Sequence, residues 1–249
     1  MLRTVNKLRK RLSAFSPPTK LALQDVQSLR AVALPTPVLT QRLQVFGAAI
    51  FLVVVPVFFQ APLVRSLPWL SLALTGTWLL AGVSLASRTS SRLWGDLLIG
   101  FTWTWLAGSL YWGWLRAEPL WHLPIEALGL PIAVGLLAQG RGRVGSYFFL
   151  GSLLGTAVTD LYIHWADLLP LWRQVMQVDP EWVPAVLQEA AIALQNSTDV
   201  SRGLLIALGL LVVGIVPLRS QQTCWWAFSG AVLSTLVVDL LFLTSALCL

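Results

Sequence analysis

Charge is scarce in this chain. Only 11% of the residues are Asp, Glu, Lys or Arg, against about 25% in an average soluble domain. Hydrophobic residues make up 56% of the chain, and the core of a water-soluble protein cannot absorb that much apolar surface. The composition therefore excludes a soluble globular domain and predicts an integral membrane protein in contact with lipid.

Cysteine and lysine are also rare. The two cysteines, Cys224 and Cys248, have no CxxC spacing, so the sequence indicates neither a disulfide framework nor a cysteine metal site. The HExxH pattern of zinc proteases is missing as well, and we expect no metal site. The only lysines are Lys7, Lys10 and Lys20, which lie outside the long apolar stretches and exclude a retinal Schiff base within them.

Long apolar stretches dominate what is present. A hydrocarbon core of ~30 Å requires about 20 helical residues. No period-two alternation is sustained, so helices are expected rather than a β-barrel. The fold class is therefore an all-α, polytopic transmembrane helix bundle of about seven spans, at 44–64, 67–87, 94–115, 123–140, 144–165, 203–219 and 224–246.

Basic residues are distributed in a way that predicts orientation. Most of them lie in residues 1–42 and in the turns that hold Arg88, Arg141 and Arg219. With seven spans these segments fall on one side, which the positive-inside rule makes cytoplasmic. The N-terminus is then cytoplasmic and the C-terminus lumenal or external. The net charge of +6 reflects this topology and does not indicate nucleic-acid binding.

Two regions are expected. Residues 1–42 read as a basic cytoplasmic segment with an amphipathic helix on the membrane surface; a transit peptide is the alternative. Residues 43–249 form the transmembrane domain. It includes a lumenal or external loop, about 166–202, with one short helix.

An internal repeat joins two of the expected spans. Residues 149–163 (FLGSLLGTAVTDLYI) align without gaps to 228–242 (FSGAVLSTLVVDLLF), matching Gly151 with Gly230 and Asp160 with Asp239. The likeness extends to the preceding spans through ALGL at 127–130 and 207–210. Tandem helical hairpins are therefore predicted, and convergent packing of small residues is the alternative.

A fainter third copy of this hairpin covers the second and third spans. There Gly100 aligns with Gly151, and Ser109 takes the position of Asp160. In the same span Asp96 follows Arg92 by four residues, which predicts a local ion pair at the helix end.

Three carboxylates form the candidate polar site. Glu126, Asp160 and Asp239 are expected at similar depths on the lumenal side, and each histidine stands four residues from one of them, His122 from Glu126 and His164 from Asp160. Acids in apolar spans are costly and commonly functional, and such pairs can bind a cation, relay protons or perform acid–base chemistry. The alternative is that these groups end their helices and reach interfacial water.

Tryptophan is abundant, with 13 residues. Trp103 and Trp105 stand in the middle of a span and Trp112 near its end. Large flat side chains suit packing against partner helices, pigments or quinones, and contact with lipid is the alternative.

The run at 92–131 contains the motif EPLWHLPIEA. Together with GSLLGTAVTDLY (151–162) and WWAFSGAVLSTLVVDLLF (225–242), it resembles a family of cyanobacterial integral membrane proteins of unknown function. The resemblance implies a thylakoid or plasma membrane, photosynthetic or bioenergetic complexes as partners, and contact with chlorophyll, carotenoid or quinone through the tryptophan-rich spans. It supplies no catalytic residue.

The function expected from all this is an accessory, assembly or interaction subunit of a larger membrane complex. A small ion-coupled transporter and an intramembrane enzyme acting on a lipid or quinone are alternatives, both using Glu126, Asp160 and Asp239. The residues do not decide whether the chain is an enzyme, and the missing signatures favour a non-enzymatic role.

Overall fold

The computed structural model describes residues 37–248. The chain divides into two compact units, Met1–Thr40 and Gln41–Leu249. The amphipathic surface helix predicted within residues 1–42 falls outside the described residues. Within 37–248 the structure contains helices and no strand, which confirms the all-α helical bundle.

Seven helical segments coincide with the seven predicted stretches. The fourth segment is broken, because prolines interrupt it, and runs from a single 3₁₀ turn at Pro119–Trp121 through two short helices. The segments are α3 Pro37–Ser66, α4 Pro68–Ala86, α5 Arg92–Leu110, α6 His122–Glu126 with α7 Leu130–Ala138, α8 Arg143–Trp165, α11 Ser197–Ile215 and α12 Thr223–Cys248.

Six of these segments are long and apolar enough to cross a membrane by length and composition, and α5 is the exception. Helix α5 packs along α4 and α8 and buries polar side chains such as Thr102 and Ser109 together with three glycines. Because its neighbours cover it, α5 does not need the apolar surface that lipid contact demands of an outer helix. The prediction of about seven spans thus corresponds to six apolar helices and a seventh that is more polar and more buried.

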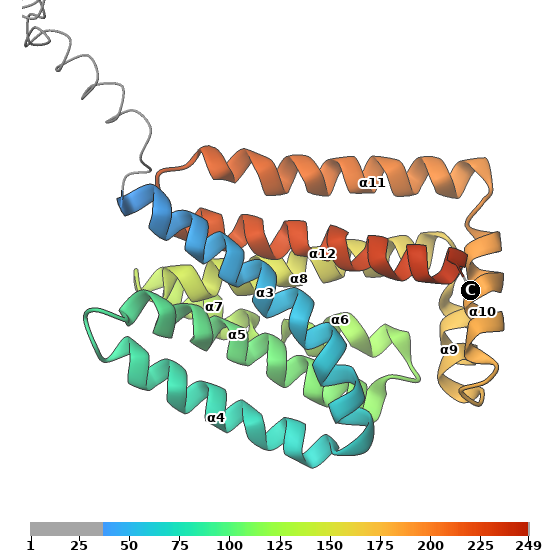
Figure 1. The fold of residues 1–249 in the computed structure, drawn as a ribbon, viewed down its shortest axis with the longest axis horizontal. Helices are drawn as coiled ribbons and strands as arrows, with labels where there is room; N and C mark the ends of the chain where they lie inside the picture. Colours follow the sequence, from blue (N-terminus) through green and yellow to red (C-terminus); the bar gives the residue numbers. More distant parts are fainter. Residues whose placement is uncertain (1–36, 249) are drawn as a thin grey trace, which may run out of the picture. The chain divides into compact units, whose positions relative to one another are not determined.

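The loop predicted at 166–202 differs from its expected form. It holds two helices, α9 Leu169–Gln177 and α10 Val183–Ala193, where one was expected. Pro170 lies in the first turn of α9, and residues 178–182 separate α9 from α10. In Figure 1 these helices lie at the end opposite the turns that join α4 to α5, α7 to α8 and α11 to α12. Those three turns contain Arg88, Arg141 and Arg219.

Glycines set the closest helix crossings. A Cβ on Gly100 of α5 would collide with the carbonyl of Gly145 on α8. A Cβ on Gly151 of α8 would lie 2.6 Å from the Phe228 carbonyl of α12, and one on Gly230 would lie 2.6 Å from the Phe46 carbonyl of α3. Each of the three glycines aligned in the predicted repeat therefore allows a neighbouring helix to approach closely. Gly100 does so between α5 and α8, Gly151 between α8 and α12, and Gly230 between α12 and α3.

Candidate functional site

The His122 side chain stands at the centre of the candidate site. Its Nδ1 lies 2.9 Å from Oδ1 of Asp160 on α8, and its Nε2 lies 3.9 Å from Oε1 of Glu126, one turn along α6. The His122 side chain is 15% exposed and that of Asp160 is 21% exposed. Both ring nitrogens of one imidazole thus face carboxylates.

Local sequence explains why His122 and Glu126 share a face. Glu118 accepts a hydrogen bond from the Leu120 amide at the start of the 3₁₀ turn, and Pro119 follows it. Helix α6 then runs for five residues from His122 to Glu126, and positions four apart lie one above the other on a helix. Glu118, His122 and Glu126 all belong to the EPLWHLPIEA motif.

Aromatic rings enclose the imidazole. Helix α5 ends in a π-helix, Tyr111–Leu115, which brings Tyr111 and Trp112 toward α6. The His122 ring centroid lies 4.3 Å from that of Tyr111, 6.1 Å from that of Trp112 and 6.3 Å from that of Trp172 on α9. The Tyr111 hydroxyl is buried and has no hydrogen-bond partner among residues 37–248.

Helix α9, which lies in the loop after α8, is held beside these aromatic rings by contacts of Trp172 and Arg173. The Trp172 indole donates to the Arg116 carbonyl at 3.0 Å. Arg173 donates to both carboxylate oxygens of Glu118, at 2.8 and 3.3 Å. The hydrogen bond from Arg173 lowers the pKa of the Glu118 carboxyl below its ordinary value. A bidentate pair of this kind fixes geometry as well as charge.

A cavity of about 480 Å³ opens beside the pair. Its polar lining consists of His122, Asp160 and His164, with Trp172 contributing an indole, and its remaining lining is apolar. His164 is exposed, and nothing in residues 37–248 forms a hydrogen bond or ion pair with its side chain. The structure therefore brings four of the five sequence candidates to one place: His122, Glu126 and Asp160 in contact, and His164 on the cavity wall.

Asp239 is the candidate that stays apart. Its Oδ2 accepts a hydrogen bond of 2.9 Å from Thr159, the residue before Asp160. Asp239 does not line the cavity. Among the described residues, no group of three or more His, Cys, Asp or Glu has an arrangement that could hold a metal ion.

The tryptophan candidates have partners within the chain. The Trp105 indole is 6% exposed, donates to the Ser71 carbonyl at 2.9 Å and packs against Phe101 and Trp78. Trp103 packs beside Gly129. Trp112 stacks at a tilt on Trp172 with centroids 5.8 Å apart, so of the three it is the one that belongs to the His122 site.

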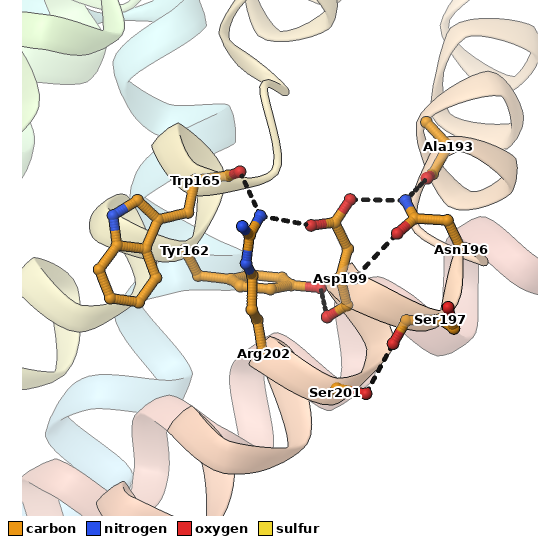
Figure 2. A network of polar contacts seen from close by, with 8 residues as sticks. All are labelled: Tyr162, Trp165, Ala193, Asn196, Ser197, Asp199, Ser201 and Arg202. Atoms are coloured by element: carbon orange, nitrogen blue, oxygen red, sulfur yellow. Dashed lines mark hydrogen bonds and ion pairs between the residues drawn. The ribbon is translucent and has the colours of Figure 1, made fainter.

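A second polar network fixes the end of α8 just beyond the site (Figure 2). The Tyr162 hydroxyl donates to the Asp199 carbonyl at 3.1 Å, and Arg202 donates to the Trp165 carbonyl at 3.2 Å and to Asp199 Oδ1 at 3.1 Å. Asn196 accepts from the Asp199 amide at 2.9 Å and so caps α11. The network ties α8 to the start of α11 and holds the helix that carries Asp160 and His164.

Sequence reasoning did not find Tyr111, Trp172 or the Glu118–Arg173 pair. The π-helix that places Tyr111 leaves no signal in the residue pattern. Trp172 and Arg173 stand in the polar loop, far from His122 and Glu118 in sequence. The one sequence feature that could have pointed to these residues is Glu118, which belongs to the motif that also contains His122 and Glu126.

The fold and the site define a multi-pass helical membrane protein with a polar centre between its helices. The chain belongs to a family described as proteins of unknown function (DUF3120), whose model matches residues 49–247. No curated protein and no solved structure matches the chain significantly. The membership confirms the resemblance to an uncharacterised family.

Proposed function

We propose that the chain binds a lipid-soluble molecule in the His122 cavity and exchanges a proton with it, as an intramembrane enzyme or carrier for a lipid or quinone would. The observation that carries this proposal is the imidazole of His122, held between the carboxylates of Asp160 and Glu126. Histidine accepts and releases protons near neutral pH. A carboxylate on the other ring nitrogen orients the imidazole and stabilises its charged form.

The setting supports use of this group rather than a purely structural role. Burying ionisable side chains within spans is costly, and such residues commonly mark functional sites. Helix packing alone does not require two carboxylates around one imidazole. The adjoining cavity of about 480 Å³ lies within the size range of small-molecule sites.

The proposal is tested by comparing the membrane lipids and quinones of strains that carry single substitutions. We expect His122→Ala and Asp160→Asn to change the extracted profile, measured by liquid chromatography and mass spectrometry. Asp239→Asn is the matched control, since it removes a carboxylate of the same type outside the cavity. Identical profiles in all strains, with each variant present in the membrane at the wild-type level, would remove the proposal.

An accessory role in a larger membrane complex is the second candidate. It is supported by large aromatic side chains on the outward surface, since Phe59 of α3 and Trp69 of α4 are each 71% exposed. Such rings fit a neighbouring membrane protein as well as lipid. The family resemblance suggests photosynthetic or bioenergetic complexes of a cyanobacterial thylakoid or plasma membrane, with chlorophyll, carotenoid or quinone nearby. Purification from the native membrane in mild detergent should then yield a stable larger assembly, and a chain purified alone would count against this role.

An ion-coupled transporter would use the same groups. This role is supported by the hydrogen bond between Thr159 and Asp239. It places the carboxylate of α12 beside α8, so that Glu126 of α6, Asp160 of α8 and Asp239 of α12 lie on three neighbouring helices. For a transporter, the single variants Asp239→Asn and Asp160→Asn should each abolish transport. The binding proposal predicts that only Asp160→Asn has an effect, so one pair of variants separates the two.

A further inference from the structure

The cavity beside His122 also indicates which class of molecule it takes, an inference that rests on the proposed function. We propose that its ligand is a neutral amphiphile whose head group carries a hydroxyl and whose apolar chain remains in the bilayer. Aliphatic lipid alcohols and phenolic quinols share this chemistry. The charge of the cavity lining, the exposed leucines at its opening and the hydrogen-bonding capacity of Asp160 each indicate this class.

Charge excludes an anionic head group. No lysine or arginine belongs to the described lining of the cavity, and Asp160 stands in its wall. Arg173 of α9, next to the lining residue Trp172, is already paired with Glu118. A phosphate entering here would meet the Asp160 carboxylate with no lysine or arginine in the lining to offset it, and like charges in a site of low polarity repel strongly.

The opening favours entry from the bilayer. Three leucines of the lining have exposed side chains: Leu120 at 61%, Leu123 at 37% and Leu161 at 41%. All three belong to candidate spans, where an exposed leucine faces lipid chains. A ligand can therefore keep its apolar chain among the lipids while its head group reaches Asp160.

Asp160 supplies a specific acceptor at the polar end. Its Oδ1 is engaged with His122, while its Oδ2 has no hydrogen-bond partner in the part of the chain that the structure describes. A carboxylate oxygen accepts and does not donate. The complementary group is a hydroxyl, which can donate to Asp160 Oδ2, and His164 on the same wall can bond its oxygen.

The experiment measures binding to the full chain in nanodiscs by isothermal titration calorimetry. Farnesol is compared with farnesyl methyl ether, which lacks the donor, and with farnesyl phosphate, which adds charge. Decylhydroquinone and its dimethyl ether form the phenolic arm. We expect one hydroxylated probe to bind at least ten-fold more tightly than its ether, since a site that pairs with a hydroxyl discriminates against analogues without it. A preference shown by farnesol identifies an aliphatic lipid alcohol as the ligand, and a preference shown by decylhydroquinone identifies a phenolic quinol.

Three variants locate the binding. Asp160→Asn keeps the shape but loses the charge-assisted hydrogen bond, so affinity should fall about ten-fold. Ala157→Phe fills the apolar part of the cavity and should abolish binding without touching the polar pair. Asp239→Asn should bind as the wild type does.

Equal affinity for alcohol and ether, tighter binding of the phosphate, or full binding to Ala157→Phe would each overturn this ligand class. The outcome is separable from that of the proposed function. If Asp160→Asn changes the membrane profile while neither alcohol binds, the ligand class is wrong and the proposed function stands. If the alcohols bind while the profile is unchanged, the cavity binds this class without the proposed proton exchange.

Discussion

His122 Nδ1 and Asp160 Oδ1 lie 2.9 Å apart, although 38 residues separate them in the chain. This contact joins α6 to α8 inside the apolar part of the protein. The preceding residue, Thr159, donates instead to Asp239 on α12. Consecutive helical residues point about 100° apart, so α8 directs one polar bond to each neighbour. For this reason, the two aspartates matched by the sequence repeat have different partners: Asp160 contacts His122, and Asp239 accepts a hydrogen bond from Thr159.

The His122–Asp160 bond should appear as an energetic coupling. Removing one partner leaves the other buried and unpaired, so His122→Gln and Asp160→Asn should each destabilise the protein, and the double variant should cost less than their sum. We expect a coupling of about 1–3 kcal/mol, measured from equilibrium unfolding in sodium dodecyl sulfate. His122→Gln combined with Asp239→Asn is the control and should be additive. Additivity in the first cycle as well would contradict the contact.

The helices were predictable because membrane insertion demands long apolar runs, and the seven stretches read from the sequence recur in the structure. The i, i+4 spacing also placed His122 beside Glu126. The partner choice was not predictable. Asp160 pairs with His122 across two helices rather than with His164 on its own, because the rotation of α8 decides which side chain meets it. The π-helix that brings Tyr111 to His122 likewise depends on tertiary packing.

The glycines at the α5–α8 crossing should tolerate no side chain. A Cβ on Gly145 would collide with the Asp96 carbonyl, and one on Gly100 with Gly145 itself. Backbone atoms cannot rotate away, so Gly100→Ala and Gly145→Ala should each cost about 1–3 kcal/mol through overpacking. Gly76→Ala and Gly135→Ala are matched controls, since nothing lies within 4 Å of their Cβ positions. Equal thermal melting temperatures for all four variants would show that the helices are not this close.

Asp96 should stabilise the protein through α8 rather than through Arg92. The expected ion pair with Arg92 does not occur among the described residues; instead Asp96 Oδ2 accepts from the Val144 amide at 2.8 Å, at the start of α8. A carboxylate at a helix N-terminus satisfies a free amide and the helix dipole. Asp96→Ala should therefore cost about 1–2 kcal/mol and Asp96→Asn less. Arg92→Ala should be nearly neutral in the same unfolding assay; a loss as large as that of Asp96→Ala would restore the ion pair.

The Glu118–Arg173 pair should make the attachment of α9 sensitive to acid. Its hydrogen bond lowers the pKa of folded Glu118 from the ordinary value of 4.5. The pair therefore contributes fully above about pH 4.5, and this contribution is lost as the pH falls through the lower folded value. A nitroxide at Gln174→Cys, in a chain without Cys224 and Cys248, reports the mobility of α9. We expect mobility to rise on acidification.

Glu118→Gln provides the comparison, because it cannot ionise and keeps only a neutral hydrogen bond. Its α9 should be mobile at neutral pH and insensitive to acid. Identical pH profiles for the two proteins would show that Glu118 does not hold the helix.

The predicted orientation can be checked with single cysteines at opposite ends of the helices. The turn that contains Arg141 and the α9–α10 region that contains Asp179 lie at opposite ends in Figure 1. If the arginine-bearing turns are cytoplasmic, Asp179→Cys should react with a membrane-impermeant maleimide in intact right-side-out vesicles, and Arg141→Cys only after permeabilisation. Both variants are made in a chain without native cysteines. The reverse pattern would invert the orientation, and labelling of both from outside would mean that the helices between them do not cross the membrane an odd number of times.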